Sequence, residues 1–374
     1  MKVLVIASFP DSLLQFRGAL LKALVANGHE VHVAAPGLLD ASAVGQQLQC
    51  FGVGVHGVYM QRTGTNPWTD LQALLGMRRL ISQMQPDVVL GYTIKPVIYG
   101  TLAAWFAGVP RRYALITGLG YAFTGQASGL RGMVKAVVQG LYRLALLRAH
   151  KVFFQNPDDE ALFRQMGLLK LGTPSAVVNG SGVDVASFNI ASFPLGPPHF
   201  LLIARLLGDK GVREYAQAAQ RIKAAHPMVQ FSLVGWIDEN PDAISQSELD
   251  AWVQAGTLNY LGRLQDVRPA IAQCSVYVLP SYREGTPRTV LEAMAMGRPI
   301  ITTNAPGCRE TVEDGANGFL VPVQSVDGLV QAMQRFIDNP ALAPRMGQHS
   351  RVLAEEKYDV HKVNAVMLRE MGLG

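Results

Sequence analysis

The chain has 374 residues, of which 49% are hydrophobic and 16% are charged, and its formal net charge is +5. This hydrophobic content excludes a disordered chain, because so much apolar surface can offset the entropy lost on ordering, and the length predicts two domains. The three cysteines, Cys50, Cys274 and Cys308, are too scattered for a disulfide framework or a Cys-x-x-Cys metal site.

The beginning of the chain enters an apolar, strand-like run after a single lysine, so we expect no secretory signal peptide. The longest uncharged candidate for a membrane span, residues 96–110, contains two glycines. It is shorter than the roughly 18–20 apolar residues that a spanning helix requires. We therefore expect a chain that does not span a membrane.

Short apolar runs alternate along the chain with longer segments of helical periodicity, such as 13–27 and 212–226. Continuous, β-branched runs are typical of strands buried on both faces of a parallel sheet. The alternation predicts an α/β fold. The predicted strands are 3–7, 31–35, 87–91, 112–116, 152–155, 176–178, 200–203, 230–234, 259–261, 276–279, 300–302 and 318–321.

The pattern restarts near residue 200, after a stretch from 172 to 198 that is rich in Gly, Pro, Ser and Asn and that we interpret as a linker. We expect two Rossmann-like, doubly wound domains, residues 1–185 and 186–354, that face each other across a central cleft. A C-terminal helix over about 355–374 is expected to pack back on the first domain. In such sheets, ligands bind beyond the carboxyl ends of the strands.

Charge is distributed unevenly along the chain. Residues 1–190 hold 16 Lys and Arg against 9 Asp and Glu, and no acidic residue lies between Asp87 and Asp158. The asymmetry indicates an anionic partner for the first half, which could be nucleic acid, anionic lipid or a phosphorylated substrate.

Residues 129–150, inside the acid-free region, carry apolar residues at helical spacing. The charges predicted to contact a membrane are Arg131, Lys135, Arg143 and Arg148. A basic amphipathic helix without acids is typical of binding to a membrane surface. The alternative is a helix that covers the sheet while its cations are merely solvated.

In the second half, the predicted strand 200–203 is followed by Arg205 and Lys210 in a turn that contains glycine. Arginine binds phosphate through its planar fork and lysine as a point charge, so this pair could clamp a diphosphate. The alternative is a solvated turn with ordinary surface cations.

The strongest signal is the segment 281–299, which directly follows the predicted strand 276–279. Thr286 is a suitable N-cap, Pro287 suits the first turn, and Gly297 with Pro299 ends a helix of about ten residues. The free amides and positive dipole end at the start of such a helix suit a phosphate group.

Glu284 lies just before this helix and Glu292 lies within it. Two carboxylates beside an anion site are unexpected for phosphate binding alone, but each could accept hydrogen bonds from sugar hydroxyls. The alternative is a capped helix with one surface glutamate and one glutamate in an ion pair.

The sequence resembles glycosyltransferase family 4, retaining transferases of the two-Rossmann-domain (GT-B) type. The resemblance covers essentially the whole chain. The matching elements are Glu284 and Glu292 (E-seven residues-E), Arg205 and Lys210 (R-four residues-K), 178–184 (the N-G-V-D linker element, with an inserted Gly-Ser step) and 27–31 (the N-G-H-E-V turn).

The resemblance implies that the second domain binds a sugar nucleotide and needs no metal or other cofactor, because Arg, Lys and the helix dipole take the place of the metal. Arg205 and Lys210 would hold the diphosphate, Glu284 the donor sugar and Glu292 the ribose; the three catalytic residues implied are Glu284, Arg205 and Lys210. Further donor-binding residues implied are Val234, Gly235, Arg263, Leu264, Gly285, Thr286, Pro287, Arg288 and Thr289.

Segments 14–17, 61–67, 91–96 and 116–121 look like a narrower subgroup, which assembles bacterial glycans on polyprenyl diphosphate for protein glycosylation and surface polysaccharides. The implied acceptor-binding residues are Arg17, Arg62, Thr93, Lys95, Thr117 and Gly118. The implied partners are a UDP-sugar (an N-acetylhexosamine or a hexose), a polyprenyl-diphosphate-linked sugar and an anionic membrane surface. The implied location is peripheral, on the cytoplasmic face of the inner membrane.

Two alternatives fit parts of the sequence. A sugar-nucleotide epimerase of the same architecture would release free sugar without any acceptor and would not need the acid-free basic half. A nucleic-acid-binding protein would use the basic half, but that region carries no recognised nucleic-acid motif.

Overall fold

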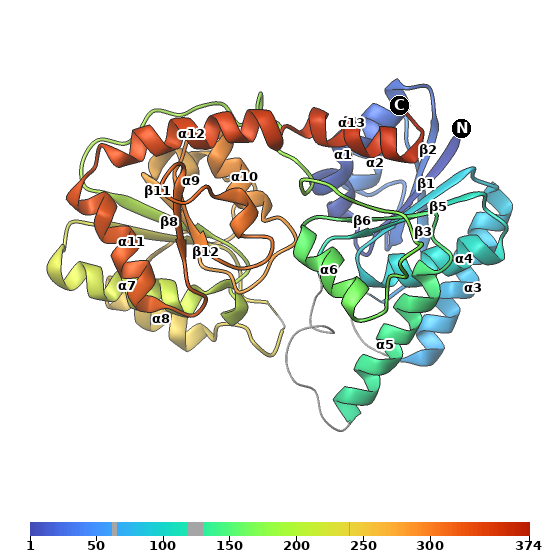
Figure 1. Cartoon of the computed structure of the whole chain (residues 1–374), viewed down its shortest axis with the longest axis horizontal. Helices are drawn as coiled ribbons and strands as arrows, with labels where there is room; N and C mark the ends of the chain where they lie inside the picture. The colour runs from blue at the N-terminus through green and yellow to red at the C-terminus, as the bar shows by residue number, and fades with distance from the viewer. Residues whose placement is uncertain (62–65, 119–129, 239) are drawn as a thin grey trace. The chain divides into compact units, whose positions relative to one another are not determined.

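The computed structural model describes residues 1–61, 66–118, 130–238 and 240–374. The chain forms two compact units, one made of Met1–Ser181 and His361–Gly374 and the other of Gly182–Val360 (Figure 1). Each unit is built on one sheet in which every strand pair is parallel. The predicted α/β fold of two Rossmann-like domains is therefore confirmed.

The sheet of the first unit has the strand order β3-β2-β1-β4-β5-β6-β7. Its strands are β1 Lys2–Ile6, β2 Glu30–Pro36, β3 Gly54–Val58, β4 Val88–Tyr92, β5 Arg111–Ile116, β6 Lys151–Phe154 and β7 Ser175–Val177. Its helices are α1 Asp11–Ala26, α2 Ala43–Cys50, α3 Pro67–Met84, the π-helical turn η1 Pro96–Gly100, α4 Thr101–Phe106, α5 Leu130–Leu146, α6 Pro157–Gln165 and α13 Val360–Met371.

Strand β1 shows why these strands are apolar at every position. Leu4 and Ile6 lie in one buried cluster with side chains of α3, α4 and α5, whereas Val3 and Val5 lie in another with side chains of α1, α2 and α13. Since successive side chains of a strand point to opposite faces, both faces of the sheet are covered and both need apolar residues.

The sheet of the second unit has the order β10-β9-β8-β11-β12-β13. Its strands are β8 His199–Ile203, β9 Gln230–Val234, β10 Asn259–Tyr260, β11 Val276–Leu279, β12 Ile300–Thr303 and β13 Gly318–Val321. Its helices are η2 Gly208–Lys210, α7 Val212–Ala225, α8 Gln246–Gln254, α9 Arg268–Gln273, α10 Arg288–Ala295, η3 Arg309–Thr311, α11 Val326–Asp338 and α12 Leu342–Lys357.

All twelve predicted strands are present, and the structure adds β3, which the sequence analysis missed. Strand β3 reads Gly-Val-His-Gly-Val, and its glycines weaken the apolar signal. Near the C-terminus, the helix expected over about 355–374 corresponds to α13, which begins at Val360 after α12 has ended at Lys357.

Part of the segment interpreted as a linker is bound tightly to the second unit by the fully buried Arg298. Its guanidinium donates hydrogen bonds to the backbone oxygens of Ala191 and Ser192 in that segment, at 2.8 Å each. It also donates to the oxygens of Ile271 and Ala272 in α9, at 3.0 and 2.9 Å. Residues 191–192 are therefore fixed against α9 rather than forming a free tether.

Replacing this arginine, in Arg298→Met, is expected to destabilise the second unit by about 3–5 kcal/mol, because a fully buried guanidinium that donates to four backbone carbonyls is lost. Denaturant-dependent hydrogen exchange of peptides from 182–360 measures the loss. The control is Arg221→Met, since Arg221 forms an exposed ion pair with Asp327 and such pairs contribute little. Equal protection of the two variants would contradict the prediction.

Candidate active site

Two loops of the second unit meet at the carboxyl ends of neighbouring strands β8 and β11. In the first loop, Gly211 has φ +70°, and a Cβ on it would lie 2.2 Å from the backbone oxygen of Pro280 in the second. The amide of Tyr282 donates to the backbone oxygen of Asp209 at 2.8 Å. The missing side chain of Gly211 therefore lets the two loops lie directly against each other.

This contact brings together two of the three predicted catalytic residues, which are 74 positions apart. Lys210 Nζ donates to Glu284 Oε1 at 2.6 Å, and the two side chains are 14% and 17% exposed. Two charges withdrawn from water in this way are costly unless paired, and such arrangements concentrate at functional sites.

A third loop fixes the backbone of Glu284. The Glu284 amide donates to the backbone oxygen of Pro306 at 3.0 Å, in the loop after β12. Gly307 in that loop has φ +80°, and a Cβ there would lie 2.1 Å from the backbone oxygen of Glu284. The carboxylate is thus carried by a backbone that three loops hold in place.

Helix α10 begins one step later than expected. Its N-cap is Pro287, in an extended conformation, and not Thr286, so the predicted cap is wrong. The proline fixes φ near the value that precedes the first turn. The predicted end is confirmed, because Gly297 adopts φ +74° just after the C-cap Met296.

Within α10, Glu292 is almost completely buried and accepts a hydrogen bond from Arg288 Nε at 2.8 Å. Burial raises the pKa of Glu292 above its ordinary value, and the positive charge of Arg288 opposes that effect. The pair matches the alternative considered from the sequence, in which one glutamate forms an ion pair.

Arg205 pairs with Asp238 rather than with either glutamate, with Nη1 and Oδ2 3.0 Å apart. It nonetheless belongs to the same charged group. Burial raises the pKa of Asp209, the Glu284 carboxylate raises it further, and Lys210 and Arg205 both lower it. The loop after β8 therefore gathers both predicted diphosphate-binding cations with Glu284.

The end of β9 approaches the end of β8 closely. Gly235 has φ +155°, and a Cβ on it would lie 1.9 Å from the backbone oxygen of Ala204. Next to it, Trp236 is exposed and lies under the guanidinium of Arg263, 4.7 Å from the ring centre. An aromatic ring stacked with arginine is a suitable platform for a planar base. The sequence analysis missed Trp236, because this residue belongs to none of the motifs that it identified.

Three other predicted donor-binding residues serve the fold where the structure places them. Val234 is buried and Leu264 packs against a buried cluster. The Thr289 hydroxyl accepts a hydrogen bond from Tyr277 at 2.7 Å. Gly285 and Pro287 are buried, and Thr286 is partly exposed.

In the first unit, Thr93 follows β4 at the carboxyl edge of the sheet with φ +68°. This conformation is strained for a β-branched residue. Its buried Oγ1 has no hydrogen-bond partner among the residues that the structure describes. The π-helical turn η1 begins three residues later. Strained residues and π-turns concentrate at functional sites.

Lys95, between Thr93 and η1, is held by the Asp70 carboxylate, which Tyr99 also contacts. Its Nζ lies 2.7 Å from Asp70 Oδ1, and the Tyr99 hydroxyl donates to Asp70 Oδ2 at 2.8 Å. Asp70 is on α3 and was missed by the sequence analysis, as was Tyr99. An anionic acceptor that binds Lys95 would compete with this carboxylate.

Three other predicted acceptor residues, Arg17, Thr117 and Gly118, lie near the ends of β4 and β5. Arg17 is buried, with its guanidinium 5.3 Å from the centre of the Tyr92 ring. Thr117 and Gly118 follow β5, the strand next to β4. Arg62 lies outside the described residues.

Helix α5 covers the sheet, as one of the two alternatives from the sequence expects, and its outer face is exposed. Tyr142 and Leu146 are buried against the sheet, while Val134, Val137 and Leu144 are exposed. Among the cations predicted to contact a membrane, Arg143 and Arg148 (just after the end of α5) are exposed, Lys135 is partly exposed, and the side chain of Arg131 lies outside the described residues. The helix covers the sheet with one face and presents apolar and basic residues with the other.

No helix in the described part of the chain combines the length and apolar character that crossing a bilayer requires. Over the same residues, no group of three or more His, Cys, Asp or Glu side chains is placed to hold a metal ion.

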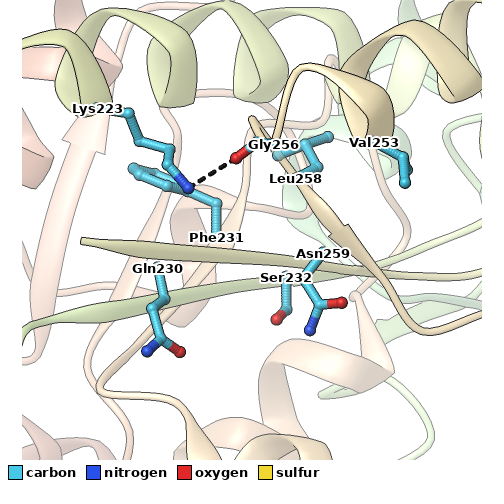
Figure 2. Close-up of a pocket in the computed structure, with 8 residues that line it drawn as sticks. All are labelled: Lys223, Gln230, Phe231, Ser232, Val253, Gly256, Leu258 and Asn259. Atoms are coloured by element: carbon cyan, nitrogen blue, oxygen red, sulfur yellow. Dashed lines mark hydrogen bonds between the residues drawn. The ribbon is translucent and has the colours of Figure 1, made fainter. Parts of the chain in front are cut away.

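A cavity of about 320 Å³ lies elsewhere in the second unit, near the start of β9 (Figure 2). The ammonium of Lys223 closes one side by donating to the backbone oxygen of Gly256 at 2.7 Å. Its lining residues are Lys223, Gln230, Phe231, Ser232, Val253, Gly256, Leu258 and Asn259. None of the predicted site residues lines it, so we do not assign it to the active site.

Comparisons with known proteins find matches over most of the chain. The family model "Glycosyl transferase 4-like domain" matches residues 16–179, and "Glycosyl transferases group 1" matches residues 197–339.

Two curated enzymes and one solved structure are similar to the chain. N,N'-diacetylbacillosaminyl-diphospho-undecaprenol alpha-1,3-N-acetylgalactosaminyltransferase of Campylobacter jejuni is 28% identical over 356 residues, 91% of this chain and 90% of that protein. UDP-Gal:alpha-D-GlcNAc-diphosphoundecaprenol alpha-1,3-galactosyltransferase of Escherichia coli is 27% identical over 287 residues, 73% and 72% of the two chains. Sucrose-phosphate synthase of Thermosynechococcus elongatus, 19% identical, superposes with a TM-score of 0.80 over 99% and 98% of the chains.

Proposed function

The chain belongs to the group 1 glycosyl transferases, with a glycosyl transferase 4-like domain in its first half, and we propose that it transfers an N-acetylhexosamine or a hexose from a UDP-sugar to a polyprenyl-diphosphate-linked saccharide. The observation that carries this proposal is the similarity, over nine-tenths of both chains, to an enzyme whose acceptor is a sugar on diphospho-undecaprenol. The product would serve bacterial glycoprotein or surface-polysaccharide assembly.

In this proposal, Arg205 and Lys210 bind the diphosphate of the donor and stabilise its growing negative charge as it leaves. Lys210 and Glu284 are already adjacent, 2.6 Å apart. Glu284 accepts a hydrogen bond from a donor-sugar hydroxyl, and Glu292 accepts one from the ribose. The two fixed cations would stabilise the charge on the diphosphate in place of a metal ion.

The proposed reaction retains the configuration at the anomeric carbon. The bond between that carbon and the diphosphate oxygen breaks, an oxocarbenium-like state forms, and the acceptor hydroxyl attacks from the same face. The leaving diphosphate takes the proton of the acceptor hydroxyl, so no side chain is required as a base.

The acceptor is proposed to bind the first unit at the carboxyl edge of β4 and β5. Lys95 would bind the acceptor diphosphate by exchanging its bond to Asp70 for one to phosphate. The hydroxyl of Thr93, which has no hydrogen-bond partner within the described part of the chain, would donate to the same ligand. We further propose that Arg143 of α5 and Arg148, two residues beyond its end, contact anionic lipid on the cytoplasmic face of the inner membrane, where each cation contributes about 1 kcal/mol.

Thermal unfolding with UDP, GDP, ADP, CMP and NAD, each with and without magnesium, tests the donor assignment. We expect UDP to stabilise the protein without metal, by about 2.7 kcal/mol at a hundred times its dissociation constant. Stabilisation by NAD alone, or by no nucleotide, would contradict the assignment. Stabilisation by GDP alone would keep the enzyme class and change the donor.

A transfer assay follows, with UDP-N-acetylhexosamines and a detergent-solubilised polyprenyl-diphosphate saccharide. Proton NMR of the product reports whether the anomeric configuration is retained. Release of free sugar at the same rate without acceptor would favour the epimerase alternative.

A further inference from the structure

Helix α3 exposes a row of large apolar side chains that the fold does not use. Trp68, Leu71 and Leu75 are 73%, 42% and 53% exposed, and their spacing places them on one face of the helix. The opposite face, with Met77 and Ile81, is already buried against the sheet. A surface helix of this kind normally carries polar residues on its outer face, so the exposed row needs a partner.

The charges on this helix favour an anionic partner. Arg78 and Arg79 are exposed in the next turn. The one acidic residue of α3 is Asp70, and its carboxylate accepts hydrogen bonds from Lys95 and Tyr99. We call Trp68, Leu71, Leu75, Arg78 and Arg79 the α3 face.

The α3 face lies on the same side of the sheet as α5. Both helices contact η1 and α4, and both contribute to the buried cluster that contains Leu4 and Ile6; Figure 1 shows them on the same side of the first unit. Helix α5 also has exposed apolar residues, exposed cations and no acid. The two helices therefore expose the same combination of apolar and basic side chains.

We propose that the α3 face docks on an anionic bilayer together with α5, with Trp68 as its anchor at headgroup depth. Tryptophan favours this depth because its ring is apolar and its N–H can stay hydrated. A second copy of the chain fits less well, because it would bring the arginines of two α3 faces against one another.

The position of Trp68 suits a membrane-bound acceptor, and in this respect the inference rests on the proposed function. Trp68 lies at the start of α3, where its amide donates to the Asn66 side chain at 3.0 Å. Two residues later, Asp70 holds Lys95. Docking through Trp68 would bring the proposed acceptor-binding lysine to the depth at which the diphosphate of a lipid acceptor lies.

The test compares Trp68→Ser with Met228→Ser, a control that removes an apolar side chain, 75% exposed, from the second unit. Binding is measured by co-sedimentation with vesicles of phosphatidylcholine and phosphatidylglycerol in equal parts. Trp68→Ser is expected to bind about tenfold more weakly than the control, the effect of losing one buried large side chain. Equal binding of the two variants would overturn the inference. So would a solution dimer that Trp68→Ser dissociates, because the face would then be covered by a second copy.

Transfer assays keep this inference separate from the proposed function. With a detergent-solubilised acceptor, Trp68→Ser is expected to turn over as the wild type does; with the acceptor in vesicles, it is expected to be slower. A slower rate in both formats would place Trp68 in the acceptor site and overturn the anchor. Failure of the wild-type protein to transfer sugar in detergent would contradict the proposed function. The comparison of vesicle binding by Trp68→Ser and Met228→Ser would still test whether the α3 face docks on a bilayer.

Discussion

The variant Glu284→Ala is expected to lose sugar transfer by about 10³-fold while the protein remains folded. The carboxylate is proposed to hold a donor-sugar hydroxyl and to position Lys210, to which it is bonded at 2.6 Å. Both roles end with the substitution. The backbone of residue 284 should keep its place, because its amide bonds to Pro306 and Gly307 packs against its carbonyl. Turnover with UDP-sugar and soluble acceptor is the measurement.

A matched control for this variant is Glu370→Ala in the first unit. Glu370 forms an ion pair with Lys151, also at 2.6 Å and partly buried, but it lies far along the chain from every predicted site residue. It should keep wild-type turnover. Normal transfer by Glu284→Ala, with UDP still stabilising the protein, would remove Glu284 from the proposed mechanism.

Substitution of the neighbouring lysine, in Lys210→Ala, is expected to lower kcat by about 10²–10³-fold, because one of the two cations that stabilise the leaving diphosphate is lost. The change should fall mainly on kcat, since the charge on the diphosphate grows as the sugar bond breaks. Arg205→Ala should show a loss of the same order. The losses from Lys210→Ala and Glu284→Ala should not add in the double variant, because the two residues act as a unit.

Lys223→Ala provides the comparison for the lysine variant. Lys223 is in the same unit and donates to the Gly256 carbonyl, but it lines the cavity near the start of β9 and not the candidate site. Equal kcat values for Lys210→Ala, Lys223→Ala and the wild type would refute the diphosphate clamp.

The strands were predictable because burial on both faces forces an apolar run, as the alternation of Val3, Leu4, Val5 and Ile6 between two cores shows. Strand β3 escaped because its glycines break that run. The start of α10 was misplaced because Thr286 and Pro287 both suit a helix start, and only the backbone shows that the proline is the cap.

For the site, the sequence supplied the residues that stand in motifs but not their partners. It named Lys210 and Glu284 separately, and the 2.6 Å bond between them depends on Gly211 lying against Pro280. Asp70 could not be predicted from the sequence, because its ion pair with Lys95 forms only when α3 packs beside η1. Contacts between residues that are far apart in the sequence cannot be inferred from the local spacing of residue types.

The return of the chain to its first unit has a consequence for folding during synthesis. The core of that unit includes Met367 and Met371 of α13, and the Tyr113 hydroxyl donates to the backbone oxygen of Met371 at 2.9 Å. A ribosome makes these residues only after it has completed all of Gly182–Val360. The second unit can therefore form its core first. Until α13 has been synthesised, the face of the first sheet that α13 covers stays exposed.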